Sequence, residues 1–109
     1  MSIRELRYFL ALAECLSFTR AADRCSVTQS TLSIQLRKLE DYLGVRLFER
    51  DRTHVALTPE GNRVLELART AVRAADEIVH VSRRTQKDAQ AAAAEPLIEE
   101  INCQRSSES

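Results

Sequence analysis

Polar side chains suited to reading nucleic acid gather between residues 28 and 38. Glutamine pairs with adenine edges, serine and threonine hydroxyls bond bases or phosphates, and arginine bonds guanine or phosphate. On a helical wheel, the side facing away from a leucine stripe holds Ser30, Ser33, Ile34, Arg37 and Lys38, while Gln29 and Thr31 lie at the N-terminal end, which usually enters the major groove. The free amides of the first turn also suit a phosphate. The predicted DNA contacts of this segment are Thr28, Gln29, Ser30, Thr31, Ser33, Ile34, Arg37 and Lys38.

Ile34 distinguishes this polar arc from an ordinary solvated helix face, which would show similar hydrophilic residues. It is apolar, yet helical spacing turns it away from the leucine stripe. A groove-facing isoleucine suits the methyl group of thymine. Chance exposure is the alternative, because single apolar residues are common on protein surfaces.

Two arginines, Arg50 and Arg52, flank a polar loop, and His54 follows them. Alternate positions of an extended strand share one face. A hairpin at this place therefore turns both arginines toward phosphates or a minor groove, and both are predicted DNA contacts. Ordinary surface arginines are the alternative.

Two short helices precede the candidate reading segment. The first begins at Ser2, whose spacing to Glu5 fits a capping box. The second covers about 20–25, and either Ser17 or Thr19 supplies its N-cap. Small alanines in the second helix allow close packing against its neighbours.

A third helix carries the candidate reading residues, and a small hairpin follows it. Thr28 caps this helix, and Gly44 ends it in the position of a left-handed C-terminal cap. The hairpin is predicted from two extended runs, Val45–Arg50 and Val55–Leu57, joined by a polar loop. The leucine stripe of the third helix steps by four, three and four residues: Leu32, Leu36, Leu39 and Leu43.

The last predicted helix is the longest and runs over 59–94, with Thr58 as its cap and Pro59 at its first position. Its section from 59 to 87 alone would be roughly 40 Å long, too long to pack fully on a domain of 58 residues. The apolar stripe therefore predicts pairing with the same helix of a second chain; the alternative is a core helix of a further C-terminal domain. Its predicted dimerisation residues are Leu65, Ala68, Val72, Ala75 and Val79, flanked at sevenfold spacing by Val64, Ala71 and Ile78.

Composition argues against several other classes of protein. The three cysteines are scattered without a Cys-x-x-Cys pair, and the two histidines are isolated, so neither a metal site nor a cofactor is expected. No phosphate-binding loop or nucleophile motif appears, which argues against an enzyme. No apolar run is long enough for a bilayer and the N-terminus has no secretory core, which predicts a cytoplasmic protein.

Charge gives only mild support for nucleic acid as the partner. The chain as a whole has a formal net charge of zero. Residues 1–58 carry nine Lys/Arg against seven Asp/Glu, a net of +2, whereas residues 89–109 carry one against four, a net of −3. The acidity therefore lies in the tail, and the reading head is slightly basic.

Taken together, the motifs closely resemble the N-terminal domain of LysR-type transcriptional regulators over residues 1 to about 88. The Arg-Ala-Ala-Asp, Thr-Leu-Ser and Arg-Lys-Leu-Glu-Asp pieces look most like the peroxide-sensing OxyR branch. The motifs that carry the resemblance are Phe18-Thr19-Arg20-Ala21-Ala22-Asp23, Val27-Thr28-Gln29-Ser30-Thr31-Leu32-Ser33, Gln35-Leu36-Arg37-Lys38-Leu39-Glu40, Leu43-Gly44-Val45-Arg46-Leu47-Phe48-Glu49-Arg50 and Leu57-Thr58-Pro59-Glu60-Gly61.

The resemblance implies a winged helix-turn-helix and a linker helix that pairs with a second copy. Family base and phosphate contacts map onto Gln29, Ser30, Thr31, Ser33 and Ile34, and wing contacts onto Arg50 and Arg52. Family members normally continue into an effector-binding domain, whereas this sequence diverges after Pro96-Leu97, so no small-molecule effector site is expected in it. None of the three cysteines matches the family's sensor cysteines.

The combined prediction is a mainly α protein: a winged helix-turn-helix over 1–58, with the helix-turn-helix at about 18–37, a dimerisation helix over 59–94, and a disordered tail over 95–109. Its predicted function is sequence-specific operator recognition by a homodimer on double-stranded DNA. The alternative is a truncated interaction protein that pairs with full-length regulators through the long helix and inhibits them.

Overall fold

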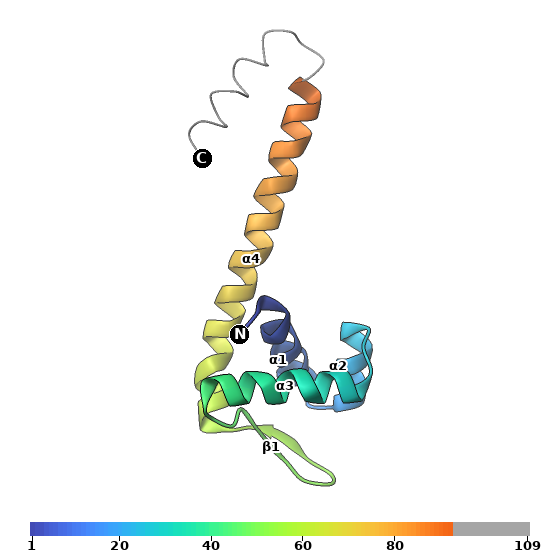
Figure 1. Cartoon of the computed structure of the whole chain (residues 1–109), viewed down its shortest axis with the longest axis vertical. Coiled ribbons are helices and arrows are strands. Elements are labelled where there is room, and N and C mark those ends of the chain that lie inside the picture. Colours follow the sequence, from blue (N-terminus) through green and yellow to red (C-terminus); the bar gives the residue numbers. More distant parts are fainter. Residues whose placement is uncertain (93–109) are drawn as a thin grey trace. The chain divides into compact units, whose positions relative to one another are not determined.

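The computed structural model describes residues 1–92 (Figure 1). The predicted mainly α fold is confirmed: three helices, a two-stranded wing and one long helix follow each other along the chain. The predicted tail over 95–109, and the last two residues of the helix predicted over 59–94, lie outside the described residues. The elements are α1 (Ile3–Cys15), α2 (Phe18–Cys25), α3 (Gln29–Leu43), β1 (Phe48–Arg50), β2 (Val55–Leu57) and α4 (Pro59–Ala92).

Serine hydroxyls start the first two helices. At α1, the Ser2 Oγ accepts a hydrogen bond from the Glu5 amide at 3.1 Å and donates one to the Glu5 carboxylate at 3.0 Å. At α2, Ser17 is the cap, because its Oγ accepts from the Arg20 amide at 3.3 Å. This decides between the two predicted caps, and α2 therefore begins two residues before the predicted start.

Gly44 ends α3 as predicted. Its φ of 72° lies in the left-handed region, and its amide donates to the Glu40 carbonyl at 2.8 Å. A glycine adopts this conformation without the strain that a Cβ brings. The turn redirects the chain from the end of α3 toward the wing.

The wing is a short antiparallel hairpin in which Phe48 pairs with Leu57 and Arg50 with Val55. The first strand is shorter than the predicted run from Val45, since only Phe48–Arg50 pairs with β2. Behind the wing, the Thr58 hydroxyl donates to the Arg46 carbonyl at 2.6 Å and accepts from the Gly61 amide at 2.9 Å. One side chain therefore ties the entrance of the wing to the start of α4.

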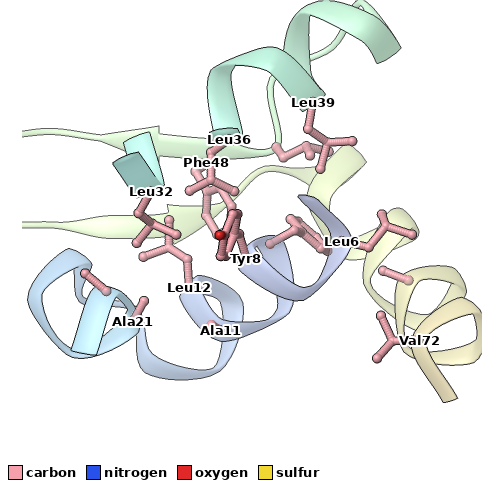
Figure 2. Close-up of a cluster of buried hydrophobic side chains, with 14 residues drawn as sticks. Leu6, Tyr8, Ala11, Leu12, Ala21, Leu32, Leu36, Leu39, Phe48 and Val72 are labelled. Carbon is pink, nitrogen blue, oxygen red and sulfur yellow. The ribbon is translucent and has the colours of Figure 1, made fainter. Parts of the chain in front are cut away.

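The hydrophobic core joins α1, α2, α3, the wing and the first half of α4 (Figure 2). Phe9 of α1 and Phe48 of β1 are fully buried, and their rings lie 5.4 Å apart at a tilted angle. Three leucines of the predicted stripe on α3, Leu32, Leu36 and Leu39, are also fully buried. Because these leucines hold one face of α3 in the core, the opposite face of the helix, with the predicted DNA contacts, is turned outward.

The first half of α4 belongs to this core, beyond residue 58, where the sequence predicts the end of the winged helix-turn-helix. Ala68 is 2% exposed and Val72 is 8% exposed, and Leu65 packs against the same cluster. The first compact unit accordingly runs over Met1–Ala74, and a second begins at Ala75. The predicted stripe begins on the face of α4 that packs against the core. An apolar stripe with steps of three and four residues can pack within its own chain or against another chain, so the spacing alone does not distinguish the two.

Of the five predicted dimerisation residues, Ala68 and Val72 are buried in the core, and Leu65 is half-buried against it. Of the other two, Ala75 is half-buried and Val79 is 46% exposed. Among the described residues, no helix is both long enough and apolar enough to cross a membrane.

Candidate nucleic-acid interface

The N-terminus of α3 is capped as predicted and faces solvent. The Thr28 Oγ1 accepts from the Thr31 amide at 3.1 Å and donates to the Thr31 hydroxyl at 3.0 Å. Both hydroxyls are thus used within the first turn, which fixes the start of the helix. Thr28 itself is exposed, whereas Thr31 is half-buried.

Gln29 and Ser30 open the helix and are both exposed. The Gln29 side chain is held from outside its own helix, because its Nε2 donates to the Thr19 Oγ1 of α2 at 3.1 Å. This hydrogen bond joins the two helices of the helix-turn-helix at their solvent side. The sequence indicated Thr19 as a possible cap and gave no sign of this contact.

Further along α3, the outward face carries the remaining predicted residues. Ile34 is 55% exposed, which confirms that it points away from the leucine core. Arg37 and Lys38 are exposed on the same helix, and Ser33 is half-buried. Because the opposite face of α3 is buried in the core, these polar side chains and Ile34 lie together on the accessible face of the helix.

Arg50 has intramolecular partners in the structure. Its Nη2 lies 3.5 Å from the Glu40 carboxylate, and its guanidinium sits 5.0 Å from the centre of the Phe18 ring. The residue as a whole is exposed, but its side chain is 30% exposed and contacts both α2 and α3. A cation over an aromatic face and beside a carboxylate is held by both.

The strand argument that placed Arg50 and Arg52 on one face is wrong. β1 ends at Arg50, and Arg52 lies in the loop beyond it, where strand alternation no longer applies. The two arginines differ in surroundings as a result: Arg50 contacts Glu40 and Phe18, whereas Arg52 is exposed at the tip of the wing.

Asp51 shapes the tip of the wing. Its Oδ1 accepts from the Thr53 amide at 2.8 Å, from the His54 amide at 2.7 Å and from the Thr53 hydroxyl at 3.2 Å. Hydrogen bonds from the Thr53 and His54 amides lower the pKa of the Asp51 carboxyl, since they favour its ionised form. The Asp51 amide also donates to the His54 carbonyl at 3.0 Å, which closes the turn that carries Arg52.

Glu40 links the reading helix to the wing. Its Oε2 accepts from the Leu47 amide at 2.7 Å and from the Phe48 amide at 3.4 Å. These amides enter the wing seven and eight residues later in the chain, and the Glu40 side chain is only 14% exposed. Sequence analysis missed this role, since a glutamate beside Leu39 also fits an ordinary helix surface.

The rest of the described chain offers little other chemistry. Within residues 1–92, no group of three or more His, Cys, Asp or Glu residues is placed to hold a metal ion. Cys15 and Cys25 are free thiols, both half-buried, and Cys103 lies outside the described residues. Burial raises the pKa of the Cys25 thiol, and this effect outweighs the attraction of nearby Arg24.

A family model described as "Bacterial regulatory helix-turn-helix protein, lysR family" matches residues 3–62 of this chain. The chain belongs to the LysR family. Its relatives in that family include the "DNA-binding transcriptional dual regulator OxyR" of Escherichia coli K12, 53% identical over 73 residues. A "Hydrogen peroxide-inducible genes activator" of Pectobacterium carotovorum is 55% identical over 73 residues. These matches confirm the expected likeness to OxyR.

Solved structures give the same family placement. Full-length OxyR C199D from Pseudomonas aeruginosa matches with a TM-score of 0.75 at 43% identity, over 77% of this chain and 28% of that one. The DNA-binding domain of BenM in a complex with benA site 1 DNA matches with a TM-score of 0.73 at 40% identity. That match covers 79% of this chain and 97% of the BenM chain.

This LysR-family chain spans only part of its longer relatives. The alignment with each of the two activators covers 67% of this chain and 24% of theirs. The matched quarter is the part with the helix-turn-helix. Activities that depend on the unmatched three quarters of the relatives are properties of those proteins.

Proposed function

We propose that this protein binds double-stranded DNA sequence-specifically, as a homodimeric transcriptional regulator. One observation carries the proposal: 79% of this chain shares its fold with 97% of the BenM chain that was solved on DNA, at 40% identity. The helix-turn-helix and the wing then form the reading head, and one face of α4 provides the contact between copies.

In this proposal, the N-terminal turn of α3 enters the major groove. Gln29, Ser30 and Ser33 meet base edges, and Ile34 meets a thymine methyl. Arg37 and Lys38 bind phosphates along the groove, and the capped first turn offers its free amides to another phosphate. The exposure of this face supports these roles.

On the wing, we assign the DNA contact to Arg52. It is exposed at the tip, and the turn built by Asp51 holds the backbone around it. An arginine there suits a phosphate or a narrow minor groove. Arg50, which stays in the proposed site as predicted, acts mainly through its contacts with Glu40 and Phe18, which hold the wing against the reading helix.

The proposed dimer uses a face of α4 different from the predicted stripe. Its exposed apolar side chains include Leu67 at 71%, Ile78 at 70% and Val81 at 52%. With Ala71 and Ala74 between them, they follow steps of four and three residues along one helix face. We call these five residues the α4 seam. In a single chain this apolar surface is exposed to water, and a two-fold pairing of two seams covers it.

Titration of labelled random-sequence duplex with the purified chain at two salt concentrations tests the proposal, followed by selection of the sequences retained. Affinity should fall steeply with salt because bound cations release counterions. The selected sites should be interrupted palindromes with half-sites about one helical turn apart, or a multiple of it. A chain that binds no duplex at low salt, yet pairs with a full-length LysR-type regulator, would instead support the inhibitory interaction protein.

A further inference from the structure

We propose that Thr19 is a specificity-determining residue that acts by positioning Gln29. This inference rests on the proposed DNA function. It starts from one contact: the Gln29 Nε2 donates to the Thr19 Oγ1 at 3.1 Å, between two helices and across ten residues of sequence. Thr19 is on α2, outside the helix that reads the bases.

The Thr19 hydroxyl is available for this task because another residue caps α2. The Ser17 Oγ accepts from the Arg20 amide, which satisfies the start of the helix. Thr19 therefore follows the cap by two positions, and its exposed side chain turns its hydroxyl to the neighbouring helix. A threonine with no capping duty and a partner on α3 is suited to orient that partner.

The chemistry of the glutamine amide makes the contact consequential. The amide has two N–H donors and one carbonyl acceptor. One N–H goes to Thr19, which leaves the other N–H and the Oε1 for a ligand. Adenine in the major groove requires this pair, since its N7 accepts and its N6 amino group donates. Guanine presents two acceptors there, which an amide held with its oxygen outward meets poorly.

Fixing the amide also reduces the entropic cost of binding. A free, exposed glutamine has many rotamers and loses them when it meets a base. The hydrogen bond to Thr19 selects one arrangement before DNA arrives, and preorganisation of this kind favours the matching partner. The fold supports the arrangement from below, since Ala21 and Ala22 of α2 and Leu32 of α3 are buried in the core.

Thr19→Val tests the proposal with little change of shape, because valine is also β-branched and keeps a similar helix propensity. The variant should lose about 2- to 12-fold of its preference for adenine at the base pair that Gln29 reads, the range of one hydrogen bond. Thr19→Ser retains the hydroxyl and should keep the preference. Thr70→Val on α4 is the matched control, because its hydroxyl bonds only the backbone of its own helix, at the Glu66 carbonyl.

A second measurement tests coupling. In a Gln29→Ala background, Thr19→Val should bring no further change in base preference, since the two residues act as one unit. Without DNA, the side-chain amide signals of Gln29 in an NMR spectrum should move in Thr19→Val and stay in Thr70→Val. This free-state readout isolates the hydrogen bond from any contact with DNA.

The outcomes separate this inference from the function beneath it. Wild-type protein that selects no sequence overturns both. Selective wild-type protein with an unchanged preference in Thr19→Val overturns the positioning role alone. An equal loss of affinity for all sequences in Thr19→Val also overturns it, because that pattern marks a phosphate contact by Thr19 itself.

Discussion

Glutamate substitutions at Val72 and Ile78 of α4 should fail in opposite ways, although only six residues separate them. Val72 is 8% exposed within the core of the first unit, whereas Ile78 is 70% exposed on the α4 seam. Val72→Glu should therefore unfold the chain. Ile78→Glu should leave each chain folded and separate the dimer.

The magnitudes follow from burial. Removing a buried valine loses about 1.5–3 kcal/mol, and an unpaired charge in its place costs several more, on the order of 3–5 kcal/mol. That sum rivals the whole stability of a small domain, about 5–15 kcal/mol. At Ile78, a surface change alters the free energy of unfolding by about 0.5 kcal/mol or less. Across a two-fold interface the same change is made twice, so dimer affinity should fall by about 3 kcal/mol or more, at least ~100-fold.

Circular dichroism melts and sedimentation equilibrium measure the two effects separately. His80→Glu is the matched control, because it places the same charge on an exposed position of α4 outside both stripes. It should change neither folding nor assembly. A cooperatively folded Val72→Glu chain with an unchanged Tm would refute the core assignment. An Ile78→Glu chain that stays dimeric, or a wild-type chain that is monomeric at high micromolar concentration, would refute the seam.

Three further predictions concern the reading surface. Gln29→Ala should relax base preference by about 1–3 kcal/mol, whereas Arg52→Ala should weaken binding evenly across sequences; identical selection profiles for the two would contradict this division. Glu40→Ala leaves two amides of the wing without an acceptor and should cost about 1–3 kcal/mol of unfolding free energy, while Glu40→Gln keeps an acceptor and should cost less, as denaturant melts will show. Asp51 has a lowered pKa, so its contribution is fully present above its ordinary value of 3.8 and is lost as pH falls through the lowered pKa; the Thr53 amide signal should therefore shift in an NMR titration with a midpoint below 3.8, and a midpoint above 3.8 would contradict the hydrogen bonds of the turn.

Local sequence rules predicted most of the elements correctly. The caps at Ser2 and Thr28 and the left-handed end at Gly44 depend on chemistry within four residues, which a single sequence displays. The leucine stripe of α3 was also correct, because a 3.6-residue period fixes which side chains share a face. The exposure of Ile34 followed from the same period.

Long-range contacts were the part that the sequence could not show. By its position in the sequence, Glu40 fits an ordinary helix surface. In the structure, its carboxylate accepts hydrogen bonds from the amides of Leu47 and Phe48. Arg50 and Arg52 are equivalent in the sequence pattern. In the structure, β1 ends at Arg50, and the Arg50 guanidinium lies over the Phe18 ring. In each case the deciding neighbour comes from another element, which no pattern within one element reveals.

The long helix is a different case, since it carries two apolar stripes with the same spacing. Helical period alone ranks the stripe containing Val72 and the seam containing Ile78 equally, and the sequence displays both. Burial separates Val72, which is 8% exposed in the core, from Ile78, which is 70% exposed. The sevenfold spacing of Ala71 and Ile78 was visible as a flank and is part of the seam.

Pairing also answers the difficulty raised by the low charge of the reading head. Residues 1–58 carry a net charge of only +2, so nonspecific attraction to phosphate from one copy is weak. In the proposed dimer, two copies joined through α4 would present two such heads to one duplex, and the second would bind as an intramolecular event at high effective concentration. Affinity then depends on matching both half-sites, which base contacts such as that of Gln29 discriminate. The proposed pairing of two mildly charged reading heads through an apolar seam would therefore favour selectivity over general attraction to DNA.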